Sequence, residues 1–309
     1  MVPPVRKAVS IGVGLAALAL ASGCGDGKGD GDASLLVVAT TSQLADFARQ
    51  VGGERVSVTA LVGPGTDPHE YEPRPSAARA VAQADVVLQS GGDVDAWLGD
   101  LLDAAGGDAR PVTLTDAVHT RPGDGGIDPH WWQDPRNVLV AVEQIRQSFG
   151  EADRAGAAAY ARNARRYATR VGALDRAIER CISAVPRARR KLVTAHDAFG
   201  YFAARYGIEI LGSIIPALSS SAKPSARDVR ELVAGIRREH VTTIFPETAL
   251  NPRLEQAVAR DAGARVGPSL YADALGPKGS EGATYLGALR HDAAAIGGGF
   301  GARCALPAR

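Results

Sequence analysis

The chain has little sulfur, few aromatic side chains and no excess of charge. Of its 309 residues three are Cys, one is Met and 5% are aromatic. Lys and Arg number 35 against 34 Asp and Glu, a net charge of +1 that becomes −1 without Arg6 and Lys7. A body so close to neutral has no electrostatic basis for binding nucleic acid or an anionic surface. No apolar run after residue 24 reaches the ~20 residues that span a bilayer.

The N-terminus has the pattern of a secretory leader that ends at a lipidated cysteine. Arg6 and Lys7 precede the apolar stretch 11–20, which is too short for a membrane span. Residues 21–24, Ala-Ser-Gly-Cys, read as a lipobox, although Leu is commoner than Ala at its first position. We expect a signal peptide over residues 1–23 and a lipid on Cys24. The alternative is simple secretion with a chance cysteine.

Residues 24–34 are expected to form a flexible tether. Residues 25–32 are Gly, Asp and Lys only, so ordering them costs entropy and buries no apolar surface. A lipid on Cys24 would anchor the chain to the outer face of the cell membrane, outside the cytoplasm. The roughly 275 residues that follow suffice for two lobes with cores of their own.

Two further cysteines, Cys181 and Cys304, remain after the expected leader. Cysteines of exported proteins often pair. Cys181 lies near the end of a long helical pattern and Cys304 near the C-terminus, so a disulfide would join the tail to the body. Two free thiols are the alternative.

Short apolar runs alternate with helical patterns in both halves, which is typical of parallel α/β units. The sequence therefore predicts two doubly wound α/β lobes, over residues 35–150 and 186–309. The expected strands are 35–39, 56–62, 85–88, 111–114, 192–195, 208–215, 242–245 and 265–267. The expected helices are 43–51, 76–83, 94–105, 198–206, 225–239, 252–262 and 283–295, with a further helix-forming region at 131–149.

The stretch 151–185 between the lobes is expected to be one long, rigid connecting helix. Apolar or large residues recur there at steps of three and four: Tyr160, Ala164, Tyr167, Val171, Leu174, Ile178 and Ile182. This spacing places them on one face of a helix. Such a helix would permit small rocking of the lobes and resist wide opening.

Four residues that follow predicted strands are candidate metal ligands: His69, His130, His196 and Asp273. In open α/β sheets, ligands bind beyond the carboxyl ends of the strands. Three imidazoles and one carboxylate form a full tetrahedral set for zinc. We therefore expect the four to meet in the crevice between the lobes. Each histidine alone is more often a capping or surface residue than a ligand.

Two acidic residues are candidates for orienting a ligand imidazole, Glu247 and, more weakly, Asp134. Glu247 is also the reserve carboxylate should Asp273 point away. A zinc hydrolase is the competing class, but catalytic zinc keeps an open position and no His-Glu-x-x-His motif occurs. We therefore expect no enzyme.

At these motifs the chain resembles the cluster A-I, or cluster 9, metal-binding proteins of ABC importers, the zinc and manganese receptors. The resemblance rests on residues 65–73 (Gly-Thr-Asp-Pro-His-Glu-Tyr-Glu-Pro), 128–137 (Asp-Pro-His-Trp-Trp-Gln-Asp-Pro-Arg-Asn), 196–202 and 271–277. It implies two α/β lobes joined by a long helix, with the metal between them. One departure is Gln133, which stands where an apolar residue is usual.

The resemblance implies that His69, His130, His196 and Asp273 bind Zn²⁺ and that an ABC permease in the membrane receives it. Histidine at position 196 favours zinc, because imidazole suits zinc while manganese prefers oxygen ligands. A manganese receptor is the alternative within the family, and a surface adhesin is the alternative outside transport. A monomer is expected, tethered to the membrane through its lipid.

Overall fold

The computed structural model describes residues 1–4, 34–106, 109, 111–123 and 126–307. Residues 34–309 form one compact unit, and residues 1–4 have no regular secondary structure. The expected lipidation site Cys24 lies outside the described residues, as do the tether up to residue 33 and most of the signal peptide. Among the described residues, none of the helices combines the length and apolar character that membrane crossing requires.

The first half contains a parallel four-stranded sheet in the order β2-β1-β3-β4. Its strands are β1 (Leu35–Ala39), β2 (Val56–Ala60), β3 (Val86–Gln89) and β4 (Pro111–Thr113). Its helices are α1 (Ser42–Gly52), α2 (Pro75–Ala82), α3 (Leu98–Ala105) and α4 (Pro135–Ala152). A small antiparallel ribbon, β5 (Pro122–Gly123) with β6 (Gly126–Ile127), precedes α4.

The second half repeats this strand order with shorter strands. Its elements are β7 (Lys191–His196), α6 (Gly200–Tyr206), β8 (Glu209–Ile215), α7 (Ala226–Arg238), β9 (Thr243–Ile244), α8 (Arg253–Ala262), β10 (Arg265–Val266) and α9 (Tyr285–Gly299). β7 pairs with β8 and β9 with β10, all in parallel. A bridge between Thr194 and Phe245 joins the two pairs, which gives the order β8-β7-β9-β10.

Both halves are therefore doubly wound. In each, the chain moves outward from its first strand to one side and then continues on the other side. The point where the direction reverses lies between β1 and β3 in the first half and between β7 and β9 in the second. Crevices at such points are the usual ligand sites of α/β sheets. The predicted α/β class is observed.

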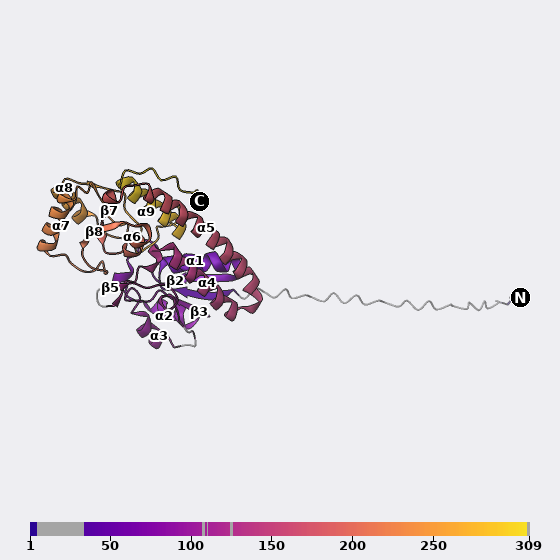
Figure 1. Ribbon diagram of the computed structural model, residues 1–309. Helices are drawn as coiled ribbons and strands as arrows, with labels where there is room; N and C mark the ends of the chain where they lie inside the picture. Colours follow the sequence, from indigo (N-terminus) through magenta and orange to yellow (C-terminus); the bar gives the residue numbers. More distant parts are fainter. Residues whose placement is uncertain (5–33, 107–108, 110, 124–125, 308–309) are drawn as a thin grey trace. The chain divides into compact units, whose positions relative to one another are not determined.

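A 27-residue helix, α5 (Ala157–Ser183), connects the halves (Figure 1). At 1.5 Å per residue it is about 40 Å long. The seven residues that the spacing placed on one face are all buried. That face packs against α1 and α4 of the first half and against α6 and α9 of the second. The lobe boundaries expected at residues 150 and 186 stay a prediction.

The described part of the chain has hydrophobic cores of different extent. The largest runs from α1 and α4 through α5 to α6, α9 and the loop before α9, and so spans both halves. A separate core fills the space between β7, β8, β9, α7 and α8. The second half thus rests partly on a core that it shares with the first and partly on one of its own.

Two expected helices begin later than the sequence patterns predict. α3 begins at Leu98 rather than near residue 94, because the buried Asp95 carboxylate accepts backbone N–H groups of Ser90 and Gly91 and holds the chain in a turn. The region expected to be helical from residue 131 starts with a 3₁₀ turn, η4 (Trp131–Gln133), and α4 begins at Pro135.

The cysteines that follow the expected leader are joined in the structure. The Cys181–Cys304 disulfide links α5 to the C-terminal segment across 123 residues of sequence. It lies against α9 at Gly297, where an added Cβ would come within 2.5 Å of Cys304 Sγ. Glycine at this position therefore lets α9 and the disulfide approach each other.

We expect a Cys181→Ser/Cys304→Ser double variant to unfold at a lower temperature than the unaltered chain. A cross-link over so long a loop restricts the unfolded chain and typically contributes about 2–4 kcal/mol. For a domain of this size the midpoint should fall by roughly 5–10 °C. Calorimetry of both proteins, with the reduced unaltered chain as control, tests this. Equal midpoints would show that the bond contributes nothing.

Candidate metal centre

His69 lies on a 3₁₀ turn, η2 (Pro68–Glu70), that follows β2. Asp67 begins this turn, and its Oδ1 accepts the backbone N–H of His69 at 2.9 Å. The other carboxylate oxygen accepts the hydroxyl of Ser220, from the second half, at 2.5 Å. The His69 side chain is only 3% exposed. The turn therefore points His69 inward and is itself fastened to the opposite half.

His130 is fully buried and is held by a residue two positions before it. Asp128 Oδ1 accepts the backbone N–H of His130 at 3.0 Å and lies 2.8 Å from its ring Nδ1. Tyr201 of α6 donates its hydroxyl to the Asp128 carbonyl at 2.9 Å. The Trp132 ring meets the His130 ring edge-on, with 5.6 Å between centroids. With Nδ1 so occupied, Nε2 is directed away from Asp128.

His196 is the last residue of β7 and is also fully buried. Glu247, which follows β9, binds it in the same way. Its Oε1 accepts the backbone N–H of His196 at 3.1 Å and lies 2.7 Å from Nδ1. Glu247 thus faces the outer nitrogen of His196, at the point where the strand order of the second half reverses. A hydrogen bond to one ring nitrogen fixes the tautomer that leaves the other free to bind a metal.

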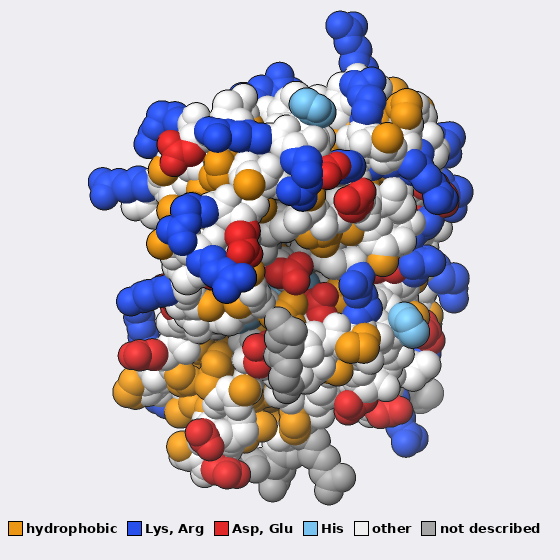
Figure 2. All heavy atoms as spheres, turned by 60° about the vertical axis from the view of Figure 1, so that its left-hand side comes forward, with side chains coloured by type: hydrophobic (Ala, Val, Ile, Leu, Met, Phe, Trp, Pro, Cys, Tyr) orange, Lys and Arg blue, Asp and Glu red, His pale blue; other side chains and the backbone are white. Residues whose placement is uncertain are grey.

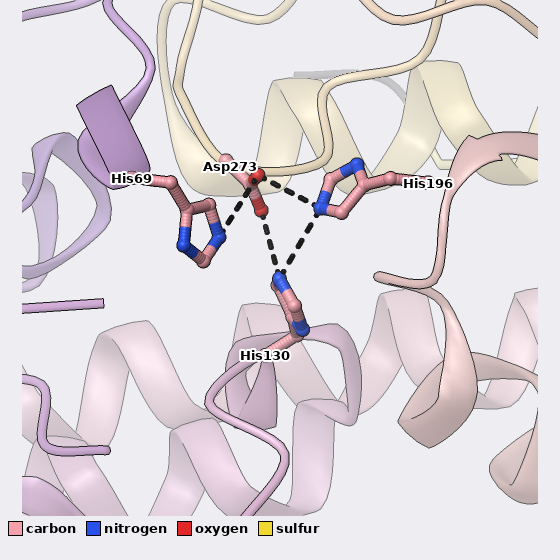
Figure 3. A group of neighbouring side chains, drawn as sticks. All are labelled: His69, His130, His196 and Asp273. Atoms are coloured by element: carbon pink, nitrogen blue, oxygen red, sulfur yellow. Dashed lines mark hydrogen bonds and ion pairs between the residues drawn. The ribbon is translucent and has the colours of Figure 1, made fainter. Parts of the chain in front are cut away.

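Asp273 lies on the loop between β10 and α9 and is 4% exposed. Figure 3 shows the three imidazoles turned towards its carboxylate. Asp273 Oδ2 lies 3.0 Å from His196 Nε2 and 3.6 Å from His69 Nε2, and Oδ1 lies 3.3 Å from His130 Nε2. The Nε2 atoms of His130 and His196 are 3.4 Å apart.

These separations suit a four-coordinate metal. Ligands at 2.0–2.1 Å from a tetrahedral zinc are roughly 3.3–3.4 Å from one another. One ligand atom from each of the four residues lies within 4.8 Å of all the others. Two side-chain atoms of these residues, His69 Nε2 and Asp273 Oδ1, are buried without a hydrogen-bond partner. Buried polar atoms normally have partners, so the orphaned pair indicates a place for a cation.

The four residues strongly shift one another's protonation. Burial raises the pKa of Asp273, but the charges of His196 and His130 outweigh it and hold the pKa well below the usual range. Burial lowers the pKa of His130, but Asp273 and the hydrogen bond to Asp128 raise it to about 9. For His196, Glu247 and Asp273 outweigh burial and raise the pKa well above its usual value. Burial lowers the pKa of His69, and the charge of Asp273 only partly offsets this.

The expectation that Asp134 orients a ligand is wrong. Asp134 caps α4 by accepting the N–H of Arg136 at 2.9 Å, and it pairs with the Arg136 guanidinium at 2.6 Å. Asp128 occupies the position beside His130 instead, although it was not among the predicted residues. The signal was present in the sequence, because an Asp-Pro pair stands directly before both His130 and Arg136. The residue after the proline decides what each carboxylate contacts.

A family model described as "Zinc-uptake complex component A periplasmic" matches residues 37–299. The manganese-binding lipoprotein MntA of Bacillus subtilis (strain 168) is 35% identical over 268 residues, which cover 84% of this chain and 87% of that protein.

Solved structures show the same similarity. The periplasmic zinc-binding protein TroA from Treponema pallidum superposes with a TM-score of 0.80 at 27% identity, covering 86% of this chain and 99% of that one. A cadmium-bound periplasmic metal-binding protein from Candidatus Liberibacter asiaticus gives 0.79 at 25% identity, covering 85% and 98%. The fold and most of the chain are thus shared with metal-binding proteins that are named for, or were solved with, different metals.

Replacing the carboxylates behind the imidazoles should lower the histidine pKa values of the metal-free protein. We expect Asp128→Asn to lower the pKa of His130 from about 9 and Glu247→Gln to lower that of His196, since each change removes a charge and a charged acceptor. NMR titration of the ring protons measures both. Asp134→Asn is the control variant, because the Asp134 carboxylate contacts Arg136 rather than an imidazole of the site. Unchanged values would show that the carboxylates do not control protonation here.

Proposed function

The chain belongs to the zinc-uptake complex component A family, and we propose that it captures Zn²⁺ outside the membrane and delivers it to the permease of an ABC transporter. It is a metal-binding component of a transport system and not an enzyme. The site residues proposed as ligands are His69, His130, His196 and Asp273. Zn²⁺ is the transported substrate, and the protein holds it only between capture and release.

The observation that carries this proposal is the composition of the site. Three imidazole nitrogens and one carboxylate converge in a buried space without cysteine. Imidazole is a preferred ligand of zinc, and four protein ligands close its tetrahedral shell. A closed shell lowers the chance that the metal activates water, which suits a carrier better than a catalyst.

Manganese is the second candidate, because one feature of the site favours it. Both oxygens of Asp273 face the imidazoles, Oδ1 towards His130 and Oδ2 towards His69 and His196. A carboxylate in this position can bind through both oxygens and add an oxygen ligand, which manganese prefers. The relative MntA is named for manganese binding.

We further propose that Cys24 carries a lipid that anchors the mature chain to the outer face of the membrane. The leader pattern supports this, and several relatives are named lipoproteins.

We expect the protein to be a monomer. On the face shown in Figure 2, acidic and basic side chains are interspersed with apolar ones. Among the described residues from 34 onwards, Leu36, Val140, Leu254 and Val266 are the large apolar side chains that are exposed.

Competition between metals tests the proposal. The metal-stripped chain should bind one Zn²⁺ that a hundredfold excess of Mn²⁺ does not displace, and His196→Ala should weaken zinc binding by at least about tenfold. Titration with bound metal counted per chain measures both. His240→Ala is the matched control, because His240 is exposed just after α7. Preferential binding of Mn²⁺ would show that manganese, not zinc, is the substrate. If no metal binds, the proposed function is wrong.

Zinc binding should release protons at neutral pH. With pKa values raised to about 9 for His130 and well above the usual value for His196, both rings hold an extra proton at pH 7 that the metal must displace. Apparent affinity should therefore rise with pH up to about 9, by at least roughly tenfold per unit. Calorimetry in buffers of different ionisation enthalpy counts the protons. If zinc binding takes up protons, or neither releases nor takes up any, the raised pKa values of His130 and His196 are contradicted.

A further inference from the structure

The peptide group before Asp273 is held by two side chains from the first half of the chain. Trp132 Nε1 donates to the Ala272 carbonyl at 2.9 Å, and Gln133 Nε2 donates to the same oxygen at 3.1 Å. Both donors lie on η4, immediately after the ligand His130. Trp132, Gln133 and Ala272 are each 2–3% exposed. A carbonyl oxygen has two lone pairs, so the two donors satisfy it fully.

This contact fixes the position of the Asp273 carboxylate. The carbonyl of Ala272 and the N–H of Asp273 belong to one rigid, planar peptide unit. Two hydrogen bonds to the oxygen therefore fix the orientation of this peptide plane, and with it the direction in which the Asp273 side chain points. Trp132 also packs edge-on against the His130 ring. The same short turn thus sets two of the proposed ligands relative to each other.

Further contacts fasten this loop to the first half. The N–H of Leu275 donates to Ser42 Oγ at 2.9 Å, and the Leu275 carbonyl accepts the N–H of Gly65 at 2.8 Å. Ser42 begins α1, and Gly65 lies in the loop that leads to His69. Ala272 and Leu275 also belong to the large core that includes α1 and α4. Residues 272–275 thus bond to the first half, while Leu270 and Tyr271 just before them bond to the second half, at Pro246, Thr248 and Asp292.

His196 is supported differently. Its backbone N–H and its Nδ1 face Glu247, and its carbonyl accepts the Thr194 hydroxyl at 2.8 Å. Both partners belong to the second half. Val193 and Ile244, on β7 and β9, lie in the separate core of that half. Towards the first half, the His196 ring contacts His130 within the site itself.

We infer that Gln133, acting with Trp132, is a positioning residue that keeps Asp273 with His69 and His130, so that His196 is the ligand that separates when the site opens. This inference rests on the proposed function and adds a division of the ligands into three and one. An apolar residue at position 133 would pack in the same place but could not donate to Ala272.

The first test uses the metal-free full-length chain and hydrogen exchange. Gln133→Leu should speed amide exchange in peptides covering residues 271–276 by about threefold or more, because one of the two hydrogen bonds to the Ala272 carbonyl is lost. Peptides covering β7 should exchange as before. Gln147→Leu is the matched control, because Gln147 is exposed on α4 and bonds only to Glu143. The positioning role would be overturned if exchange became faster throughout the chain, or if it did not become faster at residues 271–276.

The second test asks whether Gln133 acts through Asp273. Gln133→Leu should speed zinc release by roughly three- to tenfold, the range expected for one hydrogen bond. This effect should vanish in an Asp273→Ala background, because no carboxylate is left to position, and persist in a His196→Ala background. A chelator that traps released zinc gives the rates. Trp132→Phe should act in the same direction, since it removes the other donor.

The outcomes separate this inference from the proposed function. If the unaltered chain binds no metal, the proposed function fails, and the division of ligands fails with it. If zinc binds tightly but Gln133→Leu leaves its release unchanged, the receptor function stands and the inference is wrong. An equal effect of Gln133→Leu with and without Asp273 would also overturn it, because a general loosening of the fold would then be the cause.

Discussion

The structure depends on a buried negative charge that imidazoles surround. Asp273 is 4% exposed, the charges of His196 and His130 hold its pKa well below the usual range, and three imidazole Nε2 atoms lie 3.0–3.6 Å from its oxygens. A carboxylate in such a place is costly unless cations compensate for it. In the metal-free protein the compensation comes from protonated His130 and His196. Asp128 and Glu247, which lie at the Nδ1 atoms of these rings, stabilise their protonated forms. The two carboxylates therefore stabilise the metal-free protein as well as orienting the rings.

The doubly wound fold is what brings these groups together. His196 ends β7 and Glu247 follows β9, the two strands between which the chain of the second half reverses direction. No local sequence spacing relates these two residues, which are 51 positions apart. The crevice at a reversal point offers backbone ends and side chains from two strands to one volume. The remaining ligands then arrive on loops that the shared core and cross-half hydrogen bonds hold in place.

The sequence predicted the periodic parts of this molecule well. The buried face of α5 was identified correctly because a 3.6-residue repeat over seven turns has no competing interpretation. The resemblance to metal receptors is confirmed by the match over residues 37–299. Asp134 was wrongly chosen and Asp128 missed, because both precede a proline and both accept the N–H two residues on. The role of Ser220 could not be predicted, since only the tertiary fold brings it to Asp67.

The unequal support of the four ligands bears on how a tightly held metal can leave. If each half carried two ligands, opening would break two metal bonds at once and leave a poorly coordinated ion. If Asp273 moves with His69 and His130, as we infer, opening removes only His196 and leaves three of the proposed ligands in place. Zinc with three protein ligands has an open position that another donor can occupy. A ligand from the receiving protein could enter there before the remaining bonds break, and transfer would then proceed by exchange rather than by release of a bare ion.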